Sequence, residues 1–167
     1  MIIIVLGLPG SGKSYFAQAL ANDLNATYVN SDRVRNEKGA RGKYSKEEKM
    51  LIYQQMAERA REVVLTGKHV VVDGTFFLAA MIDLFRSVSS TTMTSIIFIS
   101  VVADEDLIRQ RLSEVRKDSE ADYDVYLKIK EEAEPLEIAH LTLESGRDNI
   151  DEMLSAAKEY IHRFKND

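Results

Sequence analysis

The stretch Gly7-Leu8-Pro9-Gly10-Ser11-Gly12-Lys13-Ser14 decides the fold, because it has the spacing G-x-x-x-x-G-K-S of a phosphate-binding P-loop. Its glycines let the backbone turn tightly and approach a ligand that a Cβ atom would repel. Successive N–H groups then form an anion-binding nest, to which a helix starting near Lys13 adds its positive dipole end. Lys13 can reach the β- and γ-phosphates of a nucleotide, and the Ser14 hydroxyl can hold Mg²⁺. We therefore expect nucleotide contacts from Gly7 through Tyr15.

The residues on either side of this loop provide the context that the motif requires. Residues 2–6 are a continuous apolar, β-branched run, which is typical of a strand buried on both faces. After the loop, Phe16, Leu20 and Leu24 share one face of a predicted helix. The alternative is a glycine-rich turn that matches the motif by coincidence. The order strand, loop, helix favours nucleotide binding.

The composition is that of an ordinary globular domain. The chain has 167 residues, a net charge of −5 and no cysteine, which excludes disulfides, thiolate metal sites and a cysteine nucleophile. The negative charge disfavours avid non-specific binding to nucleic acid, although residues 33–49 are locally basic. No apolar run is long enough to span a membrane. We expect one domain over residues 1–167, located in the cytoplasm without membrane contact, as a monomer or weak dimer.

Hydrophobic patterns predict strands that alternate with helices along the chain. The predicted strands cover residues 2–6, 26–30, 69–73, 96–102 and 138–143. The predicted helices begin near Lys13, cover residues 45–66, 78–88 and 149–164, and include one capped by Asp104 or Asp106 and one running from Asp122 toward Pro135. This alternation indicates an α/β fold: a parallel sheet with helices on both faces, whose ligands lie beyond the carboxyl ends of the strands.

Two acidic residues follow predicted strands and are candidates for chemistry. Asp32 and Arg35 form a D-x-x-R element, in which the carboxylate can take a proton from an acceptor hydroxyl and the arginine can hold an anionic group of that acceptor. The alternative is a capping aspartate beside a solvated arginine. Asp73 ends an apolar strand, as does a metal-proximal Walker-B aspartate, although Asp-Gly is also a turn signal. Thr75 can donate a hydrogen bond in the same crevice.

Three arginines lie on or just after the predicted helix that begins near residue 105. They are Arg109, Arg111 and Arg116. A closing lid can bring such a cation to the transferred phosphoryl group, and we favour Arg111 and Arg116 for this role over purely solvated positions. The three histidines do not cluster and are expected to be structural or solvated. The guanine motif N-K-x-D is missing, which favours ATP over GTP.

Taken in order, these elements resemble P-loop kinases of the polynucleotide 5′-hydroxyl kinase and zeta-toxin group, which includes many AAA-type predicted kinases. The P-loop, Asn30-Ser31-Asp32-Arg33-Val34-Arg35 and Val71-Val72-Asp73-Gly74-Thr75-Phe76 are similar to the first three segments of that group. Arg111-Leu112 with Arg116, then Ser119-Glu120-Ala121-Asp122 and Glu134-Pro135-Leu136, resemble its lid and the segment that follows. The lid arginines are spaced one residue wider than in that group, and we expect no second catalytic domain.

The resemblance implies a three-layer αβα P-loop NTPase fold with a five-stranded parallel sheet of order 2-3-1-4-5. It also implies an acceptor-side insertion at about 31–67 and a helical lid at about 104–135. Asp32 would be the general base, Arg35 would hold the acceptor, Lys13 and Ser14 would hold the phosphates and Mg²⁺, and lid arginines would contact the transferred group. The cofactors would be ATP and Mg²⁺, with Ser14 and Asp73 near the metal.

The acceptor hydroxyl stays open at this point. A nucleic-acid 5′-hydroxyl suits the basic stretch 33–49, whereas a small molecule such as a nucleotide, sugar or antibiotic suits the acidic chain without an aromatic platform. A non-catalytic nucleotide-binding switch is the competing class, because a switch moves loops on hydrolysis without a positioned base. A structural protein with a vestigial site is a third alternative.

Overall fold

Five parallel strands form the centre of the protein in a computed structural model that describes residues 1–40, 42, 45–114 and 121–166. Their spatial order is β2-β3-β1-β4-β5, as the resemblance implies. The strands are β1 (Ile2–Leu6), β2 (Thr27–Asn30), β3 (Val70–Gly74), β4 (Ile96–Val102) and β5 (Leu141–Glu144). The middle strand, β1, pairs with β3 and β4 and is buried over its whole length. This burial explains its unbroken apolar sequence, since both of its faces are covered.

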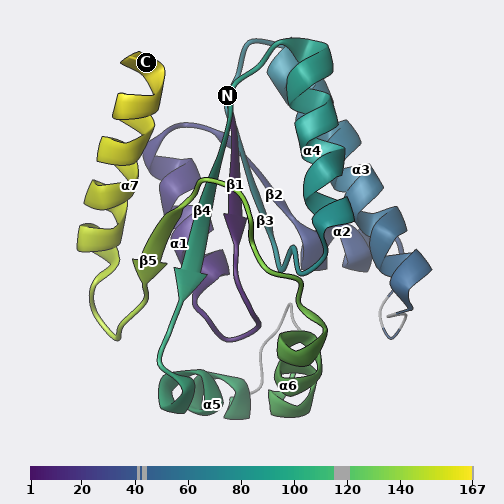
Figure 1. The fold of residues 1–167 in the computed structure, drawn as a ribbon, viewed down its shortest axis with the longest axis vertical. Helices are drawn as coiled ribbons and strands as arrows, with labels where there is room; N and C mark the ends of the chain where they lie inside the picture. The colour runs from purple at the N-terminus through teal and green to yellow at the C-terminus, as the bar shows by residue number, and fades with distance from the viewer. Residues whose placement is uncertain (41, 43–44, 115–120, 167) are drawn as a thin grey trace.

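Helices cover both faces of the sheet, so that the fold has three layers (Figure 1). On one face lie α1 (Lys13–Asp23) and α7 (Ile150–Asn166), and on the other lie α3 (Lys46–Leu65) and α4 (Ala79–Thr92). Alternate residues of β1 serve the two cores, because successive strand side chains point to opposite faces. Ile3 and Val5 pack with Phe16 of α1, whereas Ile4 packs in the core that contains Met56 of α3. The sheet and its helices are therefore the three-layer αβα fold that the sequence predicts.

Two short helices lie beyond the carboxyl end of the sheet, at the bottom of Figure 1. They are α5 (Glu105–Ser113) and α6 (Tyr123–Glu132), and we call them the lid helices. Asp104 caps α5 and Asp122 caps α6, each through its side-chain oxygen. Ile108, Leu112 and Tyr126 form a separate small core between them. The lid helices thus have an apolar contact of their own, and α6 also contributes Ile129 to the core that contains α3 and α4.

The largest differences from the predicted element boundaries occur at three places. Residues after β2 form a helix, α2 (Ser31–Glu37), which Asn30 caps by accepting a hydrogen bond from the Arg33 amide. Helix α4 continues to Thr92, four residues beyond the predicted end. Strand β5 begins at Leu141 instead of residue 138, because its pairing with β4 starts at Ile99. Helix α3 begins with a capping box, in which the Ser45 side chain accepts from the Glu48 amide and the Glu48 carboxylate accepts from the Ser45 amide.

Among the described residues, no helix combines the length and the apolar character needed to span a lipid bilayer.

Candidate active site

The P-loop turns sharply at Gly10 and Gly12, whose φ angles are +80° and +89°. Non-glycine residues rarely adopt this left-handed conformation. Gly12 also caps α1 without any side chain, and the first turn of α1 carries no acidic residue. Among the described residues, no N-cap side chain bonds the first N–H groups of this helix, which suits the anion-binding role that the sequence predicts for them.

The first lid helix packs directly on the P-loop. A Cβ atom built on Gly10 would lie 3.0 Å from Ile108 and Leu112 of α5. Arg111, on the same helix, donates to the Gly10 carbonyl oxygen at 3.2 Å. Its second terminal nitrogen donates to Ser145 Oγ at 3.1 Å and to the Gly146 carbonyl oxygen at 2.8 Å. Arg111 thereby ties three segments together: the P-loop, α5 and the loop that follows β5.

Asp32 and Arg35 are close neighbours on α2, as the D-x-x-R spacing predicts. Arg35 Nη1 donates to Asp32 Oδ1 at 3.3 Å. The Arg35 residue is 8% exposed, whereas one third of the Asp32 side chain is exposed. Asp32 therefore presents its carboxylate to solvent while the arginine behind it is held in the protein.

Asp73 lies at the end of β3 and is completely buried. Its Oδ2 accepts hydrogen bonds from Tyr28 Oη and from Asn30 Nδ2, both at 2.6 Å. No described residue bonds its Oδ1, which is also buried. Burial and the nearby Asp73 charge both raise the pKa of Tyr28, so the phenol keeps its proton and remains a donor. Sequence reasoning missed Tyr28 and Asn30, although their i, i+2 spacing places both on one face of β2.

Two pockets meet at the start of α1. The Asp32 pocket has a volume of about 420 Å³, and the Arg111 pocket has a volume of about 480 Å³. Both are lined by Lys13, Ser14 and Tyr15. The Asp32 pocket adds residues from α2, α3, α6 and the loop between β3 and α4. They include Asp32, Arg33, Arg35, Lys49, Tyr53, Thr75, Phe77 and Lys128. The Arg111 pocket adds Gly10, Gly12, Arg111, Glu114 and residues 145–150.

The remaining predicted site residues are placed as follows. Asp73 lies beneath the Asp32 pocket, behind Tyr28 and Asn30, and does not line it. Arg111 and Asp32 line different pockets, and Lys13 lines both of them. Arg116 lies outside the described residues. The structure therefore gathers Lys13, Ser14, Asp32 and Arg35 around one pocket and places Arg111 in the other, away from Asp32 and Arg35.

Arg109 contacts the other lid helix, and Glu134 in the segment after α6 contacts the start of α4. Arg109 lies 4.5 Å above the ring centroid of Tyr123 and donates to its hydroxyl at 2.9 Å, within the lid helices. The amide of Glu134 donates to the Phe77 carbonyl oxygen at 2.9 Å. Its carboxylate accepts from the Ala79 amide at 2.6 Å, at the start of α4. The chain leaving α6 is therefore anchored to the amino-terminal end of α4.

Comparison of the sequence with known proteins gives one family and a set of distant relatives. Residues 2–136 match the AAA_33 family, which is described as an AAA domain. The uncharacterized proteins Rv2004c of Mycobacterium tuberculosis and Mb2027c of Mycobacterium bovis are each 28% identical over 123 residues. The match covers 66% of this chain and 25% of each relative. The chain thus spans about a quarter of the length of these relatives.

Comparison of the fold gives solved structures that are similar over nearly their whole length. A sugar kinase from Janibacter sp. superposes with a TM-score of 0.75 at 16% identity, covering 96% of this chain and 94% of the other. A gluconokinase from Sinorhizobium meliloti gives 0.73 at 16% identity, with 97% and 91% covered. The APS kinase CysC of Mycobacterium tuberculosis, in complex with AMPPNP and APS, gives 0.71 at 20% identity, with 96% of both chains covered.

At these identities the superpositions establish the fold. The narrower resemblance to polynucleotide kinases and zeta toxins stays a prediction. The family match, in contrast, is a match of sequence over most of the chain. It runs from β1 through the P-loop, Asp32, Asp73 and the lid helices to Leu136. By this match the chain belongs to the AAA_33 family of AAA domains.

Proposed function

We propose that the protein is an ATP-dependent phosphotransferase that moves the γ-phosphoryl group of MgATP to an acceptor hydroxyl. The observation that carries this proposal is that Lys13 and Ser14 line both pockets. A nucleotide whose base lies in the Arg111 pocket would run its phosphates along the P-loop. Its terminal phosphate would then face Asp32 across the α1 amino terminus. Two pockets sharing a phosphate-binding lysine suit a reaction between two substrates better than simple nucleotide storage.

Asp32 would act as the general base. Its carboxylate would accept the proton of the acceptor hydroxyl as that oxygen bonds to the γ-phosphorus and the bond to the β–γ bridging oxygen breaks. ADP would leave with the bridging oxygen. Arg35, held 3.3 Å from Asp32, would orient the carboxylate and the acceptor. Lys13 and the α1 amino terminus would offset the charge that spreads over the transferred group.

The residues present fit a magnesium ion that the nucleotide itself brings. The described residues contain no cluster of three or more His, Asp or Glu side chains suited to a metal, so a cage made entirely by protein is missing there. Mg²⁺ commonly keeps its waters and binds phosphates plus one or two protein oxygens. The Ser14 hydroxyl would be one ligand, and the buried, unbonded Oδ1 of Asp73 is suited to hold a metal-bound water. Bound Mg²⁺ would neutralise charge on the phosphates.

The Arg111 pocket supports a role for Arg111 at the nucleotide instead of the acceptor. The Arg111 guanidinium lines this pocket and is fixed by hydrogen bonds to Gly10, Ser145 and Gly146. A planar guanidinium in such a place stacks well on a purine ring. Contact of a lid arginine with the transferred phosphoryl group stays a prediction for both Arg111 and Arg116. The preference for ATP over GTP likewise remains a prediction.

The Asp32 pocket favours a small-molecule acceptor over a nucleic-acid 5′-hydroxyl. Its volume of about 420 Å³ is in the range of pockets that hold small ligands. The similar structures named above include a sugar kinase, a gluconokinase and an APS kinase. A 5′-hydroxyl oligonucleotide remains the second candidate, because residues 33–49 carry seven lysines and arginines against three glutamates.

Transfer from labelled ATP to a panel of hydroxyl compounds tests the proposal. Asp32→Asn should lower transfer by about 100-fold or more, since it removes the base, while ATP affinity stays nearly unchanged. Asp83→Asn, which changes an exposed acid on α4 that pairs with Arg86, is the control and should transfer normally. Transfer that survives in Asp32→Asn would show that the base is wrongly assigned. ATP binding without transfer to any acceptor would favour the nucleotide switch.

A further inference from the structure

Positive charge gathers around the Asp32 pocket although the chain as a whole is acidic. Besides Lys13, the pocket is lined by four cations from three helices: Arg33 and Arg35 of α2, Lys49 of α3 and Lys128 of α6. Asp32 is the one carboxylate among its described lining residues. A net charge of −5 makes such a cluster a local feature, not a reflection of composition.

Three of these cations, Arg35, Lys49 and Lys128, lie close to one another at the pocket. Lys49 is partly buried, with its Nζ 4.8 Å from the ring centroid of Phe77. Burial lowers the pKa of Lys49, Glu132 raises it, and the positive charges of Lys128 and Arg35 lower it further. Arg35 and Lys128 are therefore close enough to Lys49 to repel it. An anion placed among these three groups would remove that repulsion.

We propose that the acceptor is a small hydroxyl compound that carries a phosphate or a carboxylate, held between Arg35 and Lys49 on one side and Lys128 on the other. This inference rests on the proposed function and specifies its substrate class. Anionic groups gain charge-assisted hydrogen bonds from such a cluster, whereas a neutral sugar gains none of this energy and a cationic aminoglycoside is repelled. The anionic group would also fix the hydroxyl relative to Asp32, since Arg35 is bonded to Asp32.

The two sides of this grip belong to different parts of the fold. Lys49 lies on α3, which packs on the sheet, whereas Lys128 lies on the lid helix α6. Ile129 of α6 already packs in the core that contains residues of α3, so an anion between the two lysines would strengthen an existing contact and help to keep the pocket closed over the phosphates. A compound that lacks the anion would leave the repulsion between the two lysines offset only by Glu132.

Binding can be measured without catalysis on the full chain. The shift in Tm is recorded with glucose 6-phosphate and gluconate against glucose, with AMP against adenosine, and with a 5′-hydroxyl oligonucleotide, each alone and with a non-hydrolysable ATP analogue. We expect at least one of the three small anions to raise Tm in the presence of the analogue and to be a phosphoryl acceptor. We expect the matching neutral compounds, glucose and adenosine, to leave Tm unchanged.

Two variants connect this response to the cluster. Lys49→Gln and Lys128→Gln should each weaken binding of the anionic compound about tenfold and raise its KM, while the Kd of the ATP analogue stays unchanged. Lys46→Gln is the matched control, because Lys46 is exposed on α3 and does not line the pocket. Equal Tm responses to neutral and anionic compounds would overturn the inference, as would unchanged binding in both variants or a response to the oligonucleotide alone.

The failure of this inference can be told apart from failure of the proposed function. If the ATP analogue binds and a neutral compound is phosphorylated, the protein is a kinase and only the anionic acceptor is wrong. If an anion binds through Lys49 and Lys128 but no hydroxyl is phosphorylated, the charge cluster is confirmed and the phosphotransferase assignment is wrong.

Discussion

Tyr28 donates a 2.6 Å hydrogen bond to Asp73 and so joins the ends of two neighbouring strands beneath the Asp32 pocket. The bond links β2 to β3, which also pair in register at Asn30 and Asp73. Because Asp73 is fully buried, its carboxylate takes hydrogen bonds from these internal donors instead of from water. The carboxylate is therefore fixed in place by Tyr28 and Asn30, whatever occupies the pocket.

Removing the Tyr28 hydroxyl should destabilise the protein. In Tyr28→Phe, Asp73 Oδ2 keeps only its bond from Asn30, and we expect the free energy of unfolding to fall by about 1–3 kcal/mol. Urea denaturation measures this change. Tyr160→Phe on α7 is the control and should be near neutral, because Tyr160 contacts Phe164 through its ring. A loss no larger than that of the control would contradict the role given to the Tyr28–Asp73 bond.

A Cβ atom at Gly12 should weaken nucleotide binding. It would lie 2.6 Å from Ser145 Oγ and 3.0 Å from Arg111, in addition to the strain of a φ of +89°. Gly67→Ala is a matched control: its φ is +80°, but no atom lies within 4 Å of its Cβ position. Gly67→Ala should lose about 1–2 kcal/mol of unfolding free energy, the cost of placing a non-glycine residue in the left-handed backbone conformation.

Calorimetric titration with an ATP analogue separates the two glycines. Gly67→Ala should bind normally, whereas Gly12→Ala should bind at least about tenfold more weakly, a change of about 1.4 kcal/mol. Normal binding by Gly12→Ala would mean that the P-loop is not the phosphate site.

The two arginines of α5 should differ in their effect on nucleotide affinity. Arg111→Ala removes the link from the P-loop to Ser145 and Gly146, and we expect about a tenfold rise in the Kd of the ATP analogue. Arg109→Ala removes a contact with Tyr123 within the lid helices and should leave this Kd unchanged. Calorimetric titration of both variants gives the comparison. Equal effects would show that α5 acts only through general stability of the lid.

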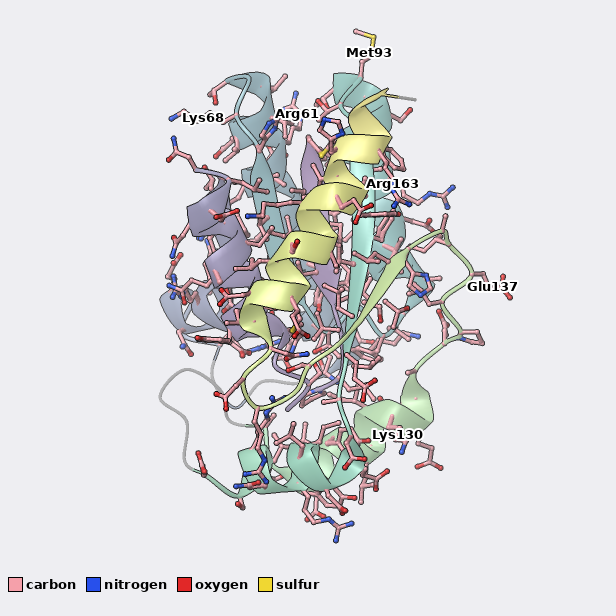
Figure 2. All side chains as sticks on the ribbon, turned by 90° about the vertical axis from the view of Figure 1, so that its left-hand side faces the viewer. Arg61, Lys68, Met93, Lys130, Glu137 and Arg163 are labelled. Atoms are coloured by element: carbon pink, nitrogen blue, oxygen red, sulfur yellow. The ribbon has the colours of Figure 1, made fainter. Side chains whose placement is uncertain are left out.

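The carboxylate of Glu134 should stabilise the start of α4. Leu78 offers no side-chain cap there, and Glu134 accepts from the Ala79 amide instead. Glu134→Ala should lower the free energy of unfolding by about 0.5–2 kcal/mol. Glu137→Ala is the control, because Glu137 points outward from the same segment (Figure 2). Thermal denaturation of both variants tests the cap, and equal Tm values would refute it.

The sequence predicts the fold well because its signals are local. The run of five apolar residues at 2–6 needs cover on both faces, and the P-loop requires a strand before it and a helix after it. The serines and threonines within 87–92 favour turns, so the predicted helix ends too early, at residue 88. In the structure this end of α4 is helical. The Thr91 hydroxyl donates to the Ser87 carbonyl oxygen, and the Thr92 hydroxyl donates to that of Val88. Val88 is buried and anchors the same turn.

The site is predicted in part, for a similar reason. Lys13, Ser14, Asp32 and Arg35 follow recognisable motifs, and the structure brings them to one pocket. The bond between Tyr28 and Asp73 depends instead on the register of β2 against β3, which no local pattern specifies. The position of Arg111 depends on the loop after β5, which lies 34 positions further along the chain at Ser145. Contacts between distant segments are invisible to a reading of neighbouring residues.

The two pockets share Lys13, which has a consequence for inhibitor design. In the proposed function, the nucleotide would occupy one pocket and the acceptor the other. A single bisubstrate molecule, with adenosine joined to an acceptor mimic by a chain of phosphates, would occupy both chambers at once. Its affinity would exceed that of either half, because the second half binds at the high effective concentration set by the linker.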